Sequence, residues 1–469
     1  MSHRTLRRTA LALALSTASA AQAGALLDLY SQALGNDKIL QIAGFQRDAA
    51  LEARPQALAP LLPQINGQGT YTLQNQNSTF STARAGSPQP MTVTQEIKNT
   101  DRALSLSLNQ AIFDWAAFTR FGQSSSQLAL AETAYQAAQQ DLILRTAQSY
   151  FNVLTTTETL RAAQAQNAAI GRQLEQSKQR FEVGLSAITD VQDAQARFDL
   201  AVAQQLQAES ALSSAQRALS QITGAADNSV IAVREDLPLT GPQPPKVSDW
   251  SDAARQGNLA VLAAQLSKTI ADADVRIARA RHFPTIGVQA GYSDSEGDNT
   301  TNDNKTPTSS DGTQIQAILN VPIFSGGATQ SGVRVARAAQ GQRQAEYDNA
   351  VRTAERNAGD AYQGVLTGIS SIKAFKAAVT STRTALEASE VGLQVGTRTA
   401  IDVLNAQQQL YAAESNYAQS RYDYLLAVLQ LKAAAGRLKQ ADLAEIDALL
   451  MPSLRRGGVV RGADGATPK

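Results

Sequence analysis

The sequence predicts a mainly α-helical protein that also carries a transmembrane β-barrel and is built from one unit written twice. Three observations support this fold class. Landmark residues of the first half of the chain return in the second half in the same order. Four runs alternate strictly between apolar and polar residues, which is the pattern of β-strands. Two very long segments without proline are rich in Ala, Gln, Leu and Glu, which favour helix.

The composition argues against an enzyme. The chain has 469 residues, no cysteine and two histidines, His3 and His282. This removes thiol catalysis, disulfides and the usual zinc sites, and leaves almost nothing for a histidine-dependent catalytic triad. The formal net charge of +1 gives no electrostatic reason to bind nucleic acid. We therefore expect no enzymatic activity, no cofactor and no metal.

The N-terminus reads as a signal peptide over residues 1–23. A basic start that includes Arg4 precedes a short apolar run over residues 10–20. Ala21-Gln22-Ala23 is a small-x-small cleavage site, so the mature chain would begin at Gly24. The alternative is a short membrane anchor, but the run is far below the roughly 20 residues that a spanning helix needs. A membrane location would therefore require β-strands.

The internal repeat divides the chain. The paired landmarks are Pro63 and Pro284, Leu108-Asn109 and Leu319-Asn320, Val183-Gly184 and Val395-Gly396, and Asp190 and Asp402. We predict a first repeat over residues 24–223, a proline-rich linker or equatorial region over 224–248, and a second repeat over 249–445. The remaining residues, 446–469, are predicted to be a disordered tail.

Each repeat begins with a helix, predicted over residues 25–57 and 249–281. Pro60 and Pro63 end the first, and Pro284 ends the second, because proline cannot continue a helix.

Two strands follow the first helix in each repeat. The alternating runs cover residues 64–73, 104–109, 286–292 and 315–323. They are close to the length of a tilted membrane-spanning strand, and each has one apolar and one polar face. A soluble sheet is the alternative, but the sequence offers no other strands to cover its edges. Four strands cannot close a barrel, so closure requires several chains, and three chains would supply twelve strands around a lumen.

The intervening segments are predicted to be polar, solvent-facing loops. They cover residues 74–102 and 293–313, which are rich in Ser, Thr, Asn, Asp and Gly. Beyond the strands, residues 114–181 and 328–391 should each form one long helix, followed by a short glycine turn and a medium helix. Helices of this length suggest coiled coils, so a structural or adhesive surface protein without transport activity is the alternative reading.

The two turns carry a family resemblance. The segments Arg180–Leu185 and Ala187–Gln192, together with Val395–Thr399 and Asp402–Leu404, resemble the TolC family of outer-membrane efflux and secretion channels. The resemblance covers most of the mature chain and is nearer to TolC itself than to the lipid-anchored branch, which begins with a cysteine.

The resemblance implies a homotrimer whose twelve-stranded barrel lies in outer-membrane lipid and continues as an α-helical tunnel across the periplasm. It implies an exit duct for multidrug efflux, type I protein secretion or both. It also implies a periplasmic gate that opens on docking to an adaptor (membrane fusion) protein and to an inner-membrane efflux pump or ABC transporter.

The resemblance also assigns site residues. It places the periplasmic tip at two glycine turns, the pore constriction at an aspartate, and a latch between an arginine and the opposite turn. The matching residues are Gly184 and Gly396 for the turns, Asp402 for the constriction, and Arg398 with Thr189 and Asp190 for the latch. Three Asp402 carboxylates around one axis should repel one another and raise at least one pKa.

The chain departs from the family pattern at two positions. Asn405 stands where a second pore aspartate is expected, and Leu393 replaces a gate tyrosine. We therefore expect a less cation-selective constriction and a looser latch. The alternative role for Asp190 and Asp402 is helix N-capping after a glycine turn, with the neighbouring threonines as rival caps.

Overall fold

The computed structural model describes residues 25–82, 91–225, 230–234 and 236–450. The predicted signal peptide over 1–23, with cleavage before Gly24, lies outside the described residues. The chain forms two compact units. The first takes Met1–Gly44, Tyr135–Val261 and Val351–Lys469, and the second takes Phe45–Ala134 and Leu262–Ala350. Each compact unit therefore draws on both copies of the repeat.

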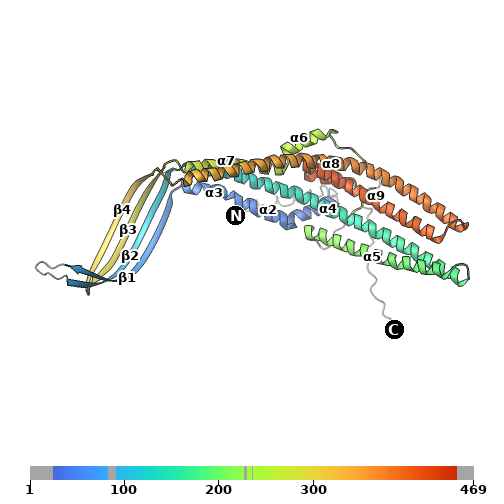
Figure 1. The fold of residues 1–469 in the computed structure, drawn as a ribbon, viewed down its shortest axis with the longest axis horizontal. Helices are drawn as coiled ribbons and strands as arrows, with labels where there is room; N and C mark the ends of the chain where they lie inside the picture. The colour runs from blue at the N-terminus through green and yellow to red at the C-terminus, as the bar shows by residue number, and fades with distance from the viewer. Residues whose placement is uncertain (1–24, 83–90, 226–229, 235, 451–469) are drawn as a thin grey trace, which may run out of the picture. The chain divides into compact units, whose positions relative to one another are not determined.

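The second unit contains a four-stranded antiparallel sheet with the order β1-β2-β3-β4 (Figure 1). The strands are β1 (Gln64–Thr82), β2 (Met91–Phe113), β3 (Thr285–Thr301) and β4 (Asn304–Asn320). The predicted strands are confirmed, but their ends are not. Pro322 lacks a backbone N–H, and β4 stops two residues before it.

The prediction of polar loops over 74–102 and 293–313 is wrong for residues 74–82, 91–102 and 293–301, 304–313, which belong to strands; residues 83–90 lie outside the described part of the chain. Backbone pairing runs without interruption from Thr285↔Asn320 to Thr301↔Asn304, and it does not depend on side-chain polarity. Only Asn302 and Asp303 form the turn, with φ of 44° and 67°. Asn and Asp tolerate this left-handed conformation, which two-residue hairpin turns require.

The register gives the sheet one apolar and one polar face. Directly paired residues on adjacent strands share a face. One row across the four strands is Ile65, Leu108, Ala290 and Ile315. The adjacent row is Gln64, Asn109, Gln289 and Gln316. The alternation predicted for each strand is therefore aligned between strands, as a wall between lipid and water needs.

The sheet is bare within one chain. The side chains of Ile65 and Leu104 are each 65% exposed, and that of Ile315 is 80% exposed. In the described part of the chain, β1 and β4 are edge strands with no further strand beside them. Exposed apolar faces and open edges are unstable in water, so both must be covered in the working protein.

The helices that open each repeat are broken, contrary to the prediction of one continuous helix. The first copy forms α1 (Ala25–Asn36), α2 (Lys38–Leu51), α3 (Ala53–Leu58) and a 3₁₀ turn, η1 (Ala59–Leu61); the second forms α6 (Val247–Gly257) and α7 (Leu259–Ala280). Asp37 and Asn258 cause the equivalent breaks, because their side chains accept hydrogen bonds from the next helix. The Leu40 N–H donates to Asp37 Oδ1 at 2.7 Å, and the Ala260 N–H donates to Asn258 Oδ1 at 2.9 Å.

The predicted long helices are confirmed. They are α4 (Trp115–Glu182) and α8 (Ala328–Gln394), with 68 and 67 residues, and each is followed by a medium helix, α5 (Ile188–Thr223) or α9 (Ala400–Ala434). Alanines at seven-residue intervals are buried along α5: Ala194, Ala201, Ala208 and Ala215. Their small side chains allow close helix packing in heptad register. Among the described helices, none is long and apolar enough to cross a membrane.

The linker between the copies packs on the first unit. The Tyr150 hydroxyl donates to Ile231 O at 2.7 Å and accepts from its N–H at 3.0 Å. The Tyr424 hydroxyl makes the same pair of bonds with Thr240, at 2.9 and 3.2 Å. Val233 is only 1% exposed. Two tyrosines, one on α4 and one on α9, therefore fix the linker backbone.

The predicted disordered tail over residues 446–469 is wrong for residues 446–450. Residues 446–450 are ordered, because α10 (Gln440–Asp447) packs on the first unit and buries Ile446. Leu450 pairs with Val233 in an antiparallel bridge. The carboxylate of Asp447 also accepts hydrogen bonds from Leu26 N at 3.1 Å and Leu27 N at 2.9 Å, at the start of α1. Residues 451–469 lie outside the described part.

Candidate functional site: the paired helix turns

The α4–α5 turn is closed by backbone hydrogen bonds around one glycine. Gly184 has φ of 74°, a left-handed conformation that glycine adopts without a Cβ penalty. The Leu185 N–H reaches back to Arg180 O at 2.8 Å. This is the helix C-terminal motif in which a left-handed residue satisfies the last free carbonyls.

The α8–α9 turn repeats this geometry. Gly396 has φ of 80°, and the Thr397 N–H donates to Gly392 O at 2.8 Å. A Cβ on Gly392 would lie 2.6 Å from Arg398 Cγ. The Arg398 stem therefore packs against the helix at a position where only glycine fits.

Asp402 is held by the start of α9. Its Oδ2 accepts the Thr399 N–H and the Thr399 hydroxyl, each at 2.9 Å, while its own N–H donates to Thr399 Oγ1 at 3.2 Å. The N-cap of α9 is therefore Thr399, the rival cap, and Asp402 is the N3 residue of the same capping box. Within one protomer, the hydrogen bonds from the backbone and hydroxyl of Thr399, with the nearby charge of Arg398, hold the pKa of Asp402 below its usual range.

The N-capping alternative is wrong for the first copy. The N-cap of α5 is Ala187, which has no side chain able to cap, and Thr189 and Asp190 lie inside the helix. The Asp190 side chain is exposed. Its carboxylate therefore carries no capping role within the chain.

A cavity of about 340 Å³ lies between the two turns. Its lining includes Arg398, Asp190, Leu393 and Gly396 from the predicted set; the other lining residues that matter below are Arg180, Asp193 and Arg197. Thr189, Gly184, Asp402 and Asn405 do not line it. The structure thus brings the predicted latch residues Arg398 and Asp190 to one cavity. Among the described residues of a single protomer, they form no ion pair with each other.

Sequence reasoning missed Arg197. Its Nη1 donates to Asn405 Oδ1 at 3.2 Å and so connects α5 to α9. The signal was present in the spacing, because Asp190, Asp193 and Arg197 stand at i, i+3 and i+7 and share a helix face. The spacing could not show the partner of Arg197, because Asn405 lies 208 residues away in the sequence.

A larger groove of about 730 Å³ runs between α4, α8 and α9 and carries excess positive charge. Arg383 pairs with Glu414 at 2.8 Å, but Lys376 and Arg421 make no ion pair among the described residues. Arg421 is only 7% exposed, its Nε has no hydrogen-bond partner, and Nη1 donates to Arg234 O at 3.3 Å. The Arg421 guanidinium also lies over the rings of Tyr417 and Tyr422, 5.1 and 5.8 Å from their centroids.

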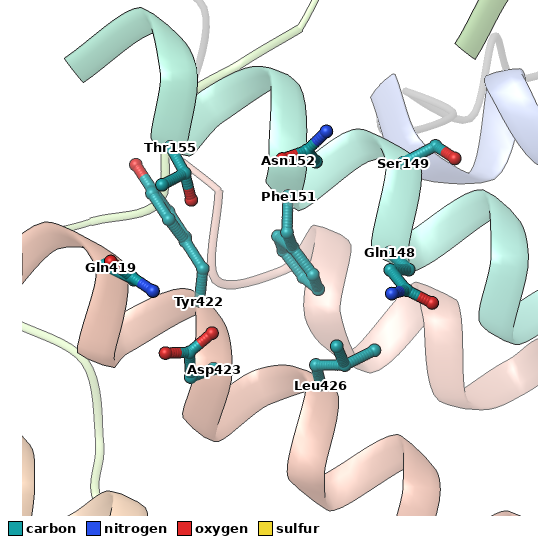
Figure 2. Close-up of a pocket in the computed structure, with 9 residues that line it drawn as sticks. All are labelled: Gln148, Ser149, Phe151, Asn152, Thr155, Gln419, Tyr422, Asp423 and Leu426. Carbon is teal, nitrogen blue, oxygen red and sulfur yellow. The ribbon is translucent and has the colours of Figure 1, made fainter. Parts of the chain in front are cut away.

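A third cavity, of about 400 Å³, lies between α4 and α9 (Figure 2). Phe151 and Tyr422 stack at its base, with ring centroids 5.9 Å apart. Amides surround them, and Asp423 is the one ionisable carboxyl in the lining. Burial raises the pKa of Asp423. No group of three or more potential metal ligands occurs among the residues that the structure describes.

Comparison with known proteins identifies the architecture. The family model for outer membrane efflux proteins matches residues 29–225 and 250–437. The outer membrane protein TolC of Vibrio cholerae is 35% identical over 435 residues, covering 92% of this chain and 94% of that protein. The alkaline protease secretion protein AprF of Pseudomonas aeruginosa is 31% identical over 430 residues, covering 89% and 85%. The crystal structure of the Campylobacter jejuni CmeC outer membrane channel superposes with a TM-score of 0.71 at 19% identity, covering 92% and 91%.

A strand-bearing, two-repeat chain with paired helix turns of this kind is an outer-membrane channel, a transport protein and not an enzyme. The chain belongs to the outer membrane efflux protein family, in its TolC group. The resemblance read from the two turns is thereby confirmed. The family's members are trimeric channels that work with efflux or secretion systems and extend from the outer membrane into the periplasm.

Proposed function

We propose that three copies of this chain form an exit duct that carries drugs out of the cell, secreted proteins, or both. The observation that carries the proposal is the bare sheet. Its apolar row is open to lipid, its amide row to water, and its two edges to neighbouring copies. Twelve strands would enclose a lumen. Secretion is supported by AprF, whose name is that of a protease secretion protein.

The paired turns are the gate of this duct in our proposal. Asp402 forms the constriction, and Arg398 with Thr189 and Asp190 forms the latch between turns. Two features support these roles. The capping bonds of Asp402 use Oδ2 and leave Oδ1 for a cation. Arg398 is exposed and has no ion pair within its own protomer among the described residues. An exposed Arg–Asp pair is weak enough for a docking partner to open.

Substitution of either gate residue is expected to change ion flow through the purified trimer. In planar lipid bilayers, Arg398→Ala should raise single-channel conductance several-fold, because it removes the latch. Asp402→Ala should abolish block by multivalent cations, because it removes the charge that attracts them. The control is Asp360→Ala, which deletes an exposed carboxylate in the middle of α8.

Strong cation block that survives Asp402→Ala would contradict the assignment of the constriction. A wild-type trimer that does not conduct at all would contradict the duct itself and would favour the structural or adhesive alternative.

We further propose that the basic groove between α4, α8 and α9 receives a periplasmic adaptor, which connects the duct to an inner-membrane efflux pump or ABC transporter. Lys376, which lines the groove and has no ion pair in the described part of the chain, supports an acidic docking partner. The groove lies on the first unit, as do the two turns. Binding there can therefore bias the helices that lead to the turns.

Charge reversal in this groove is expected to impair docking without unfolding the trimer. Lys376→Glu should weaken adaptor co-purification about tenfold, because it places a like charge against an acidic partner. Lys373→Glu is the matched control, since Lys373 is exposed on the same helix but does not line the groove. Equal loss in both variants would argue for a nonspecific charge effect and against this docking site.

A further inference from the structure

The contact between α5 and α9 brings a guanidinium to the proposed constriction. Arg197 Nη1 donates to Asn405 Oδ1 at 3.2 Å. Asn405 follows Asp402 by three residues on α9, so the two share one helix face. The helix face that carries the proposed constriction aspartate therefore also carries the Asn405 amide, to which the Arg197 guanidinium is hydrogen-bonded.

The charged residues around the turns include both arginines and aspartates. The cavity between the turns has three arginines in its lining, Arg180, Arg197 and Arg398, against two aspartates, Asp190 and Asp193. On α9, Asp402 is the one acidic residue between Arg398 and Glu414. A guanidinium beside Asn405 offsets part of the attraction that Asp402 exerts on cations.

The two copies differ at the position concerned. Asn405 corresponds to Asp193 of the first copy, because Asn405 follows Asp402 by three residues and Asp193 follows the equivalent Asp190 by three. If the second copy had also kept a carboxylate, Arg197 would face it as an ion pair. The amide still accepts the hydrogen bond, but unlike a carboxylate it brings no negative charge to Arg197.

We infer that Arg197 is a selectivity-determining residue of the gate, which lowers the cation preference of the constriction by holding its guanidinium on Asn405. This inference rests on the proposed channel function and deepens it. An exposed hydrogen bond of this length contributes little to folding, so its main effect is electrostatic. The charge of Arg197 matters more than its exact shape.

The test is the reversal potential of the purified trimer in planar bilayers under a KCl gradient. Arg197→Gln should raise the ratio of K⁺ to Cl⁻ permeability about threefold or more, because one positive charge per protomer leaves the constriction. Arg197→Lys keeps the charge and should retain the wild-type ratio. Arg217→Gln, which removes an exposed arginine bonded to Ser213 and Ser214 farther along α5, should also retain it.

A second pair of variants tests the contact itself. Asn405→Asp should raise the permeability ratio less in the presence of Arg197 than in the Arg197→Gln background, because the guanidinium neutralises the new carboxylate. Equal increases in both backgrounds would overturn the inference, as would an unchanged ratio in Arg197→Gln. A wild-type trimer without conductance would instead overturn the proposed function, so the two failures are distinguishable.

Discussion

Gly436→Ala is expected to abolish the folded trimer. Gly436 follows α9 with φ of 67°, and a Cβ there would lie 1.9 Å from Gly257 O and 2.3 Å from Gly257 C. The left-handed conformation alone costs an alanine about 1–2 kcal/mol. The overlap is with backbone, so it cannot be relieved by rotating a side chain. The segment must move, which breaks the bond from Asn258 Nδ2 to Ala434 O, now 2.9 Å.

The measurement is heat-modifiable trimer migration of outer-membrane extracts, with urea unfolding of any trimer recovered. Gly359→Ala is the matched control, because Gly359 lies inside α8 with an ordinary φ, and a Cβ added there would meet no atom within 4 Å. Alanine in a helix interior should stabilise the trimer by about 0.5–1 kcal/mol. Wild-type migration and an unchanged urea midpoint for Gly436→Ala would contradict this prediction, because they would show that the contact between Gly436 and Gly257 tolerates a side chain.

Asp37→Asn is expected to destabilise the first unit strongly. Asp37 is 3% exposed, accepts from Arg145 at 2.8 and 3.1 Å, and caps α2 through the Leu40 N–H. Removing one partner of a buried ion pair costs about 3–5 kcal/mol. We expect the lower end of this range, because Arg145 is 23% exposed and keeps its bond to Asp141. The urea midpoint of the trimer measures the loss.

The effect should depend on pH in a defined direction. Burial alone would raise the pKa of Asp37, but the hydrogen bonds from Arg145 and the Leu40 N–H outweigh it and hold this pKa below the usual value. A lowered folded pKa stabilises the protein above the unfolded pKa of about 3.9, and this contribution is lost as pH falls further. The urea midpoints of wild type and Asp37→Asn should therefore differ at pH 7. The difference should begin to shrink below about pH 4 and disappear once the pH has fallen through the lowered folded pKa of Asp37.

The control for this prediction is Asp236→Asn. Asp236 pairs with Arg234 at the surface, where water screens the interaction, so its loss should leave the midpoint unchanged. A constant difference between wild type and Asp37→Asn down to acidic pH would mean that shape, and not charge, accounts for the role of Asp37.

The sequence predicted the large elements because their signals are repeated along many residues. The absence of proline over residues 114–181 and the alanine-rich composition suffice for α4, whatever packs against it. The alternation through Ile65 likewise identifies β1. Its length was underestimated because residues 74–79 are polar on both faces, and backbone pairing with β2 sustains the strand there.

Features that depend on one long-range contact could not be predicted. The break at Asp37 combines its local cap of the Leu40 N–H with the ion pair to Arg145, which lies 108 residues away and stabilises the buried carboxylate. Arg197 was missed for the same reason. The roles of Asp402 and Arg398 came from the family resemblance, whereas the capping bond between Asp402 and Thr399 could be read from their spacing alone.

Because each compact unit combines segments from both copies, neither copy by itself contains a complete unit. A closed ring of six identical single copies would have sixfold symmetry, whereas a ring of three two-copy chains has threefold symmetry. Equivalent positions then need no longer hold the same residue, and Asp37 and Asn258, like Asp193 and Asn405, could diverge. The two halves of the chain can therefore carry different side chains at equivalent positions, which six identical copies could not.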